Sequence, residues 1–227
     1  MMNMNVLLFG ATGMVGQGVL RQCLLDPDVQ AVLSLGRTAA GVTHPKLGEI
    51  VRADLLNYDD IESDLRGFDA CFFRLGVSAA GMSESQYERV TYDIAIAAGQ
   101  TLSRLNPGMT FIYISGAGTD SSEKGRLMWA RVKGKTENAL SRLPFKAAYM
   151  FRPGVIQPMH GERSKTLAYR IGYSLTKPLL PLLRSLFPNS VLTTEEIGRA
   201  MIQAARFGYP KRILESADIR DCARPRV

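Results

Sequence analysis

The chain has 227 residues, of which 46% are hydrophobic and 22% charged, a composition typical of one globular domain with a sizeable core. Three widely spaced cysteines exclude a disulfide framework, and two histidines without a ligand cluster predict that no metal is bound. The net charge of +7 suits a phosphorylated small molecule, and no motif points to a nucleic acid. Because no apolar run is long enough to cross a bilayer and no basic leader is evident, we expect a cytoplasmic protein without a transmembrane segment.

Segment 4–25 predicts a buried strand, a glycine-rich turn and a helix. Gly10, Gly13 and Gly16 follow the apolar run 6–9 at every third position. They would allow a sharp exit from the strand, close approach of the backbone to a pyrophosphate, and tight packing of the helix on its strand. The spacing G-x-x-G-x-x-G departs from the common fingerprint G-x-G-x-x-G, so an ordinary βα turn is the alternative. The strand before it and the helix after it favour nucleotide binding.

The end of the second predicted strand, 31–35, carries the next signal. In NAD-binding folds of this kind, an acidic residue about 20 positions beyond the glycines holds the ribose 2′-hydroxyl. Here Arg37 stands 21 residues after Gly16. A guanidinium suits a 2′-phosphate by its charge and its forked donors, so we expect NADP(H) to be preferred over NAD(H). The alternative is a solvated loop arginine.

The remaining pattern alternates strands with helices. Further strands are predicted over 48–53, 70–75, 110–114 and 147–151, with 213–215 as a seventh. Helices are predicted over 57–65, 83–105 and 127–143. This order predicts an α/β fold, a doubly wound parallel (Rossmann) sheet of six to seven strands in a single domain over 1–227.

Two residues stand out at the ends of the central strands. Ser115 follows strand 110–114, at the edge where parallel sheets place their chemistry, although a serine there is also a common turn former. Arg74 interrupts an apolar strand. Its side chain is expected either to be buried and paired or to reach a phosphate, and the sequence leaves both alternatives open. The loop 76–81 would pass over the cofactor.

These motifs together resemble the short-chain dehydrogenase/reductase superfamily over about residues 4–156. They are G-A-T-G-M-V-G at 10–16, Arg37, Asp54-Leu55, Ser115, Lys133 and the Arg-Pro-Gly of 152–154. The similarity is greatest to its atypical or extended branch, the Tat-interacting-protein-like and epimerase-dehydratase-like proteins. Combined with the residue analysis, the resemblance implies these cofactor-binding residues: Gly10, Thr12, Gly13, Met14, Val15, Gly16, Arg37, Asp54, Leu55, Leu75, Gly76, Lys133, Pro153 and Gly154.

The resemblance also implies a catalytic set of serine, tyrosine and lysine, the last two spaced as Y-x-x-x-K. Ser115 and Lys133 match this set, but Trp129 occupies the tyrosine position. An indole N–H is only a donor and cannot act as a general acid at neutral pH. Two functions stay open: an oxidoreductase or epimerase-like enzyme acting on a small carbonyl or sugar-type substrate, and a sensor that binds NADP(H) without turnover. Trp129 is interpreted either as an aromatic wall or as packing.

Segment 157–192 alternates basic with apolar residues and is interpreted as a variable substrate or interface segment. We expect a small pair of helices packed on the core; homodimer formation and peripheral membrane contact are the alternatives. The final predicted helix, 194–206, would be capped by Thr193 or Thr194.

Overall fold

The computed structural model describes residues 3–162 and 191–225. Its main sheet has seven strands, all parallel, in the order β3-β2-β1-β4-β5-β6-β9. The strands are β1 (Met4–Phe9), β2 (Val29–Gly36), β3 (Leu47–Val51), β4 (Ala70–Phe73), β5 (Thr110–Ile114), β6 (Ala147–Arg152) and β9 (Ile213–Glu215). The order reverses between β1 and β4, and such a switch point opens a crevice at the carboxyl ends of the strands. The predicted doubly wound sheet is confirmed.

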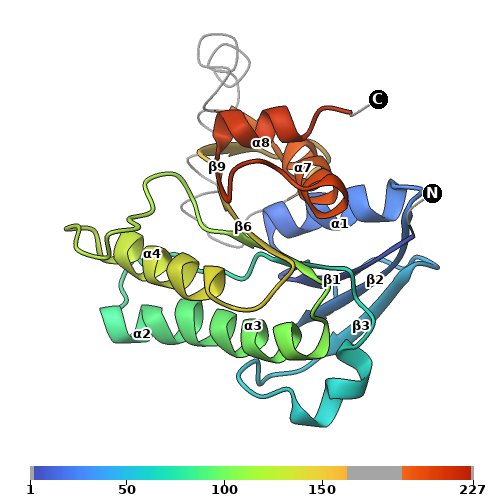
Figure 1. Cartoon of the computed structure of the whole chain (residues 1–227), viewed down its shortest axis with the longest axis horizontal. Helices are drawn as coiled ribbons and strands as arrows, with labels where there is room; N and C mark the ends of the chain where they lie inside the picture. The colour runs from blue at the N-terminus through green and yellow to red at the C-terminus, as the bar shows by residue number, and fades with distance from the viewer. Residues whose placement is uncertain (1–2, 163–190, 226–227) are drawn as a thin grey trace.

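Helices cover both faces of this sheet (Figure 1). One face carries α1 (Met14–Leu25), α7 (Thr194–Phe207) and α8 (Ser216–Cys222). The other carries α2 (Glu84–Glu88), η2 (Arg89–Asp93), α3 (Ile94–Leu105) and α4 (Met128–Ser141), with the 3₁₀ helix η1 (Asp59–Leu65) beside them.

The alternation of side chains along β1 divides the core into two layers. Val6 and Leu8 pack towards α1 and α7, whereas Leu7 and Phe9 pack towards α3. All four side chains are fully buried. On the α3 side Phe9 lies 4.9 Å, centroid to centroid, from Phe73 of the neighbouring strand. A central strand buried on both faces therefore requires the continuous apolar run found in the sequence.

Helix starts agree with the capping residues expected from the sequence. Thr193 caps α7, with its hydroxyl accepting from Glu196 N (3.0 Å) and the Glu196 carboxylate accepting from Thr193 N (2.7 Å). Ser83 makes the same capping box at α2. The helix predicted over 83–105 is present as α2, the π-helical turn η2 and α3 in direct succession, and the short helix predicted over 57–65 is the 3₁₀ helix η1 at Asp59–Leu65.

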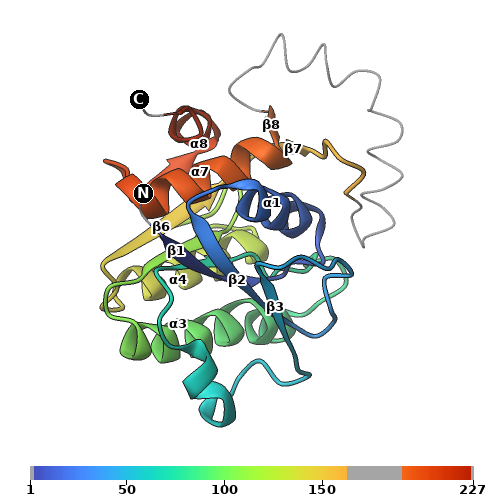
Figure 2. The ribbon, with the colours of Figure 1, turned by 90° about the vertical axis from the view of Figure 1, so that its right-hand side faces the viewer.

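A second, two-stranded parallel sheet was not predicted. It joins β7 (Val155–Gln157) to β8 (Val191–Thr193), and Figure 2 shows it beside the start of α7. Three-residue strands are too short for a period-2 pattern to be seen. Most of the predicted segment 157–192 lies outside the described residues. Within the described ranges, no helix has both the length and the apolar character needed to span a bilayer.

Candidate functional site

The glycine turn between β1 and α1 is built so that side chains are excluded from two positions. Gly10 has a φ of 82°, and a Cβ there would lie 2.5 Å from the carbonyl oxygen of Arg74. A Cβ on Gly16 would lie 1.9 Å from the carbonyl oxygen of Gly10. Gly13 N donates to Gly10 O (3.1 Å) and is the N-cap of α1. The turn therefore offers backbone and helix dipole, without side-chain bulk, to a pyrophosphate.

The other residues of the turn can contribute backbone groups. The side chains of Met14 and Val15 are buried, so only their N–H groups can face a ligand. Those groups belong to the first turn of α1, where N–H donors lack an intrahelical acceptor. Gln17 Nε2 donates to Thr12 O (3.0 Å) and holds the turn in place. The residues present thus fit the phosphates of a dinucleotide.

The predicted adenosine side of the site lies beyond β2 and β3. Arg37 is exposed at the end of β2, and its guanidinium makes no hydrogen bond or ion pair with any residue in 3–162 or 191–225. Asp54 is exposed, and its carboxylate accepts from Leu56 N (2.8 Å). Leu55 is buried at 3% exposure. A cation at this place is accessible to an added phosphate.

Arg74 follows β4 and lies directly against the glycine turn. Its N–H donates to Phe9 O (3.1 Å), and a Cβ on Gly13 would lie 2.9 Å from its Nη1. The half-buried side chain therefore covers the second glycine. Next along the chain, Leu75 packs against the core beneath α3, and Gly76 is exposed. The guanidinium of Arg74 thus lies beside the glycine turn, and both alternatives left by the sequence stay predictions.

Lys133 projects from α4 towards the loop after β5. Its Nζ donates to Ser115 O and lies 6.0 Å from the centroid of the Trp129 ring, one helical turn earlier. Burial, and to a lesser extent the positive charge of Arg74, lower the pKa of Lys133 to about 8, with the charge of Glu137 acting in the opposite direction. An ammonium with this pKa can give up a proton near neutral pH. The Trp129 ring lies against Gly118, where a Cβ would be 3.5 Å from Cη2.

The Ser115 hydroxyl is held by a buried carboxylate that sequence reasoning missed. Its Oγ donates to Glu137 Oε1 (2.5 Å), with Phe151 O at 3.2 Å as a second acceptor. Glu137 is ion-paired with Arg152, whose Nε lies 3.0 Å from Oε1. A hydroxyl has one proton, so while it donates to Glu137 it cannot donate to a substrate carbonyl. The available signal was spacing, since Glu137 follows Lys133 by four residues on one helical face.

The three tyrosines that the sequence offers near α4 in the described part of the chain do not replace the missing phenol. Tyr113 and Tyr87 are buried, at 1% and 2% exposure, and burial raises the pKa of both. The ring of Tyr92 is covered by Lys135 Nζ, 4.5 Å from its centroid. These three phenols are therefore core and surface packing groups in the described structure.

Pro153 and Gly154 connect the loops at the carboxyl ends of β5 and β6. Pro153 O accepts from Ala117 N (2.9 Å), and Gly154 N donates to Ser216 Oγ (2.8 Å). The first bond fixes the Ser115 loop against the end of β6. It therefore places both segments at the edge of the sheet that also carries the glycine turn.

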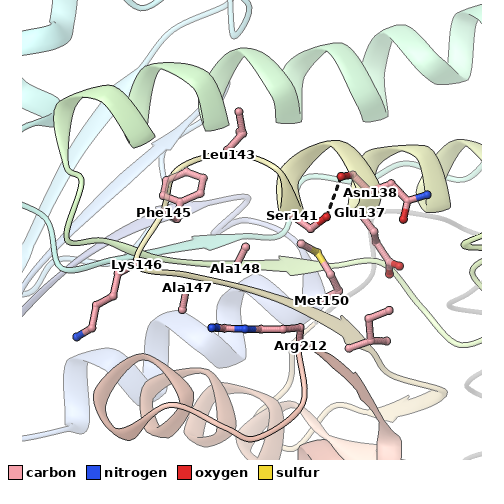
Figure 3. Close-up of a pocket in the computed structure, with 11 residues that line it drawn as sticks. Glu137, Asn138, Ser141, Leu143, Phe145, Lys146, Ala147, Ala148, Met150 and Arg212 are labelled. Atoms are coloured by element: carbon pink, nitrogen blue, oxygen red, sulfur yellow. Dashed lines mark hydrogen bonds between the residues drawn. The ribbon is translucent and has the colours of Figure 1, made fainter.

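A separate hollow of about 350 Å³ lies between α4 and the starts of β6 and β9 (Figure 3). Figure 3 shows Glu137 and Lys146 at its two ends. Its lining is Glu137, Asn138, Ser141, Leu143, Phe145, Lys146, Ala147, Ala148, Met150, Arg212 and Ile213. None of the residues predicted from the sequence to form the site is among them, so this hollow is distinct from the glycine turn.

Comparison with known proteins tests these assignments at the level of the family. The NAD(P)H-binding family matches residues 10–142, more than half of the chain. The protein FMP52-2, mitochondrial, of Scheffersomyces stipitis is 30% identical over 161 residues, which cover 70% of this chain and 67% of that protein. The protein fmp52-2, mitochondrial, of Neosartorya fischeri is 27% identical over 221 residues, covering 93% of each.

Solved structures with the same fold have low sequence identity to this chain. The Bordetella bronchiseptica enzyme WbmF in complex with NAD+ superposes with a TM-score of 0.67 at 13% identity, over 97% of this chain and 77% of that one. The Helicobacter pylori ADP-L-glycero-D-manno-heptose-6-epimerase gives 0.65 at 17% identity, over 90% and 73%. At these identities the superpositions show the fold alone, and it is the fold expected from the resemblance to the short-chain dehydrogenase/reductase superfamily.

The predicted cytoplasmic location is wrong. It depended on the lack of an apolar run long enough to cross a bilayer and of a recognised basic leader, neither of which identifies a compartment. The curated relatives are named as mitochondrial proteins, and this contradicts the expectation. The glycine turn, the parallel sheet and the match over residues 10–142 establish that the chain belongs to the NAD(P)H-binding family.

Proposed function

We propose that the chain is an NADP(H)-dependent oxidoreductase acting on a small carbonyl or sugar-type substrate. The observation that carries this proposal is that the glycine turn and the Lys133 ammonium lie at one edge of the sheet, joined through Arg74, which contacts the turn and lowers the pKa of Lys133. A binding surface for phosphates and a titratable group thereby share one crevice.

Each residue has a role that follows from its placement. Gly10, Gly13 and Gly16, with the first N–H groups of α1, would hold the pyrophosphate. Arg37 is accessible to the 2′-phosphate that distinguishes NADP(H) from NAD(H). The dinucleotide, when bound, supplies or accepts the hydride.

Lys133 is the group that we assign to proton transfer. Its pKa of about 8 keeps the ammonium mostly charged at pH 7 while making the proton easier to release than that of an exposed lysine. Trp129 then forms an aromatic wall beside Gly118, against which a flat substrate can pack. The Ser115 hydroxyl can donate a hydrogen bond to a substrate only after it turns away from Glu137.

A sensor that binds NADP(H) without turnover is the second candidate. It is favoured by the same hydrogen bond from Ser115 to Glu137 and by the indole at the tyrosine position, because both remove proton donors from the substrate side. In that case Lys133 would serve only to bind the cofactor ribose.

Titration of the intrinsic fluorescence with NADPH and NADH tests the cofactor assignment. Arg37→Asp is expected to weaken NADPH and to move the preference towards NADH. Arg142→Asp, the same charge change at the exposed C-cap of α4, is the matched control and should leave both affinities unchanged. Equal binding of NADPH and NADH by the wild type would contradict the preference.

Turnover separates the two candidates. NADPH oxidation is followed at 340 nm with a panel of small aldehydes, ketones and sugar-derived carbonyls, using the wild type and Lys133→Met. Turnover that the substitution abolishes supports the oxidoreductase. Tight NADPH binding with no turnover across the panel supports the sensor.

A further inference from the structure

Arg74 is fixed by its backbone to the glycine turn. The register of β4 with β1 pairs Phe73 with Phe9, and the next residue, Arg74, donates its N–H to Phe9 O (3.1 Å). Its carbonyl lies where a Cβ on Gly10 would be, at 2.5 Å. The chain at Arg74 and the first glycine are therefore in contact, and neither can move without the other.

The side chain of Arg74 returns over the same turn. A Cβ on Gly13 would lie 2.9 Å from Nη1 and 3.5 Å from Cζ, so the guanidinium lies on the N-cap of α1. The N-terminus of a helix carries a partial positive charge. The first turn of α1 contains no acidic residue that would offset it. A guanidinium at this end of the helix adds positive charge where the helix already favours an anion.

Lys133 adds a third positive group at this edge. The charge of Arg74 contributes to the lowered pKa of Lys133, so the two cations are within electrostatic reach of each other. Glu137 offsets part of this positive charge, and an anion bound between the two side chains at the helix N-terminus would offset more of it. A pyrophosphate diester brings two negative charges in one compact group, which suits this arrangement.

We propose that the Arg74 guanidinium binds the pyrophosphate of the dinucleotide, opposite the N-terminus of α1. This inference rests on the proposed binding of NADP(H). Arginine suits the role because its planar fork can donate two hydrogen bonds to one phosphate. Arg74 then differs in function from Arg37: it acts on phosphates that NADH and NADPH share, whereas Arg37 acts on the 2′-phosphate alone.

Equilibrium titrations of Arg74→Gln with NADPH, NADH and ADP-ribose test the proposal. Loss of a charge-assisted hydrogen bond is expected to weaken all three ligands by about 10- to 100-fold, with the ratio between NADPH and NADH unchanged within about twofold. ADP-ribose contains the pyrophosphate but no nicotinamide, so an equal loss assigns the contact to the phosphates. Arg142→Gln, at the opposite edge of the sheet, is the control.

Each outcome has a distinct meaning. Affinities of Arg74→Gln within twofold of the wild type overturn the proposal, and so does a loss confined to NADPH. A wild type that binds none of the three ligands overturns the proposed function itself. If circular dichroism shows that Arg74→Gln does not fold, Arg74→Lys carries the test. It keeps the charge but loses the fork, and should weaken NADPH and NADH equally by about 3- to 10-fold.

Discussion

The buried pair of Glu137 and Arg152 gives the sharpest prediction of stability. The Glu137 side chain is 2% exposed and accepts hydrogen bonds from Ser115 Oγ at 2.5 Å and Arg152 Nε at 3.0 Å. Removing the carboxylate with Glu137→Ala leaves a guanidinium charge in a largely buried place. Breaking such a pair from one side costs about 3 to 5 kcal/mol of unfolding free energy.

The remaining partners of Arg152 set where in that range the value should fall. Its Nη2 also donates to Ser121 Oγ (2.6 Å), and its Nη1 lies 3.5 Å from a carboxylate oxygen of Glu215. These contacts keep the guanidinium partly satisfied, so we expect about 3 kcal/mol, near the lower limit. For a domain of this size, that corresponds to a fall in Tm of about 6 to 12 °C.

Urea denaturation followed by circular dichroism measures this loss. Glu215→Ala is the control, because its side chain is 53% exposed and its contact with Arg152 is longer; since Glu215 also caps α8, its removal should cost about 1 kcal/mol, well below the loss at Glu137. The double variant Glu137→Leu with Arg152→Met removes both charges and should recover most of the stability. The reasoning is refuted if the unfolding free energy of Glu137→Ala lies within about 1 kcal/mol of the wild-type value. It is also refuted if the double variant is destabilised by as much as the two single variants added together.

Three further predictions concern the crevice. Gly16→Ala places a methyl 1.9 Å from Gly10 O and should abolish detectable NADPH binding in a fluorescence titration, whereas Gly108→Ala, at an exposed position with open space around the added methyl, should retain it; equal affinities of the two variants would contradict the role of the turn. Because Lys133 has a folded pKa of about 8, below its ordinary value of 10.5, the unfolded chain binds more protons between these values, and unfolding free energy should rise with pH from about 8 to 10. Urea denaturation at several pH values should show this rise in the wild type but not in Lys133→Met. If the unfolding free energies of both proteins have the same pH dependence, the Lys133 ammonium is not buried. Trp129→Tyr places a phenol four residues before Lys133, and should raise carbonyl-dependent NADPH oxidation by about 100-fold if a phenol there is a better proton donor than the Lys133 ammonium; an unchanged rate would show that the indole is not what limits turnover.

The sheet could be predicted from the sequence because each strand carries its own local signal. Strand 110–114 is bounded by Gly108 and Ser115 and is buried throughout, and the prediction agrees with β5 at both ends. The seventh strand, 213–215, was also found at its observed bounds. For strand 110–114, an apolar run between turn residues is sufficient information for a parallel strand; strand 213–215 has only the apolar pair Ile213-Leu214.

The features that were missed depend on contacts between distant residues or on subtle backbone geometry. The division of segment 83–105 by η2 leaves the apolar periodicity almost unchanged, so no pattern predicts it. The second sheet pairs residues 36 positions apart, from Val155 to Val191. The hydrogen bond from Ser115 to Glu137 joins residues 22 apart and requires the relative position of β5 and α4. Sequence spacing alone gives no distance of this kind.

The site therefore divides into a cofactor side, where the sequence and the geometry agree, and a substrate side, where they conflict. Lys133 could act on the cofactor or on the substrate. Loss of activity on its substitution therefore cannot by itself show that it transfers a proton. Ser115 is more informative because its hydroxyl has one proton to donate and two competing acceptors, Glu137 and a substrate carbonyl. If the hydroxyl only supports Glu137, Ser115→Ala should lower stability and leave kcat unchanged. If it turns to the substrate during turnover, the same variant should lower kcat by more than the loss of stability explains, and that difference would identify the serine as part of the reaction.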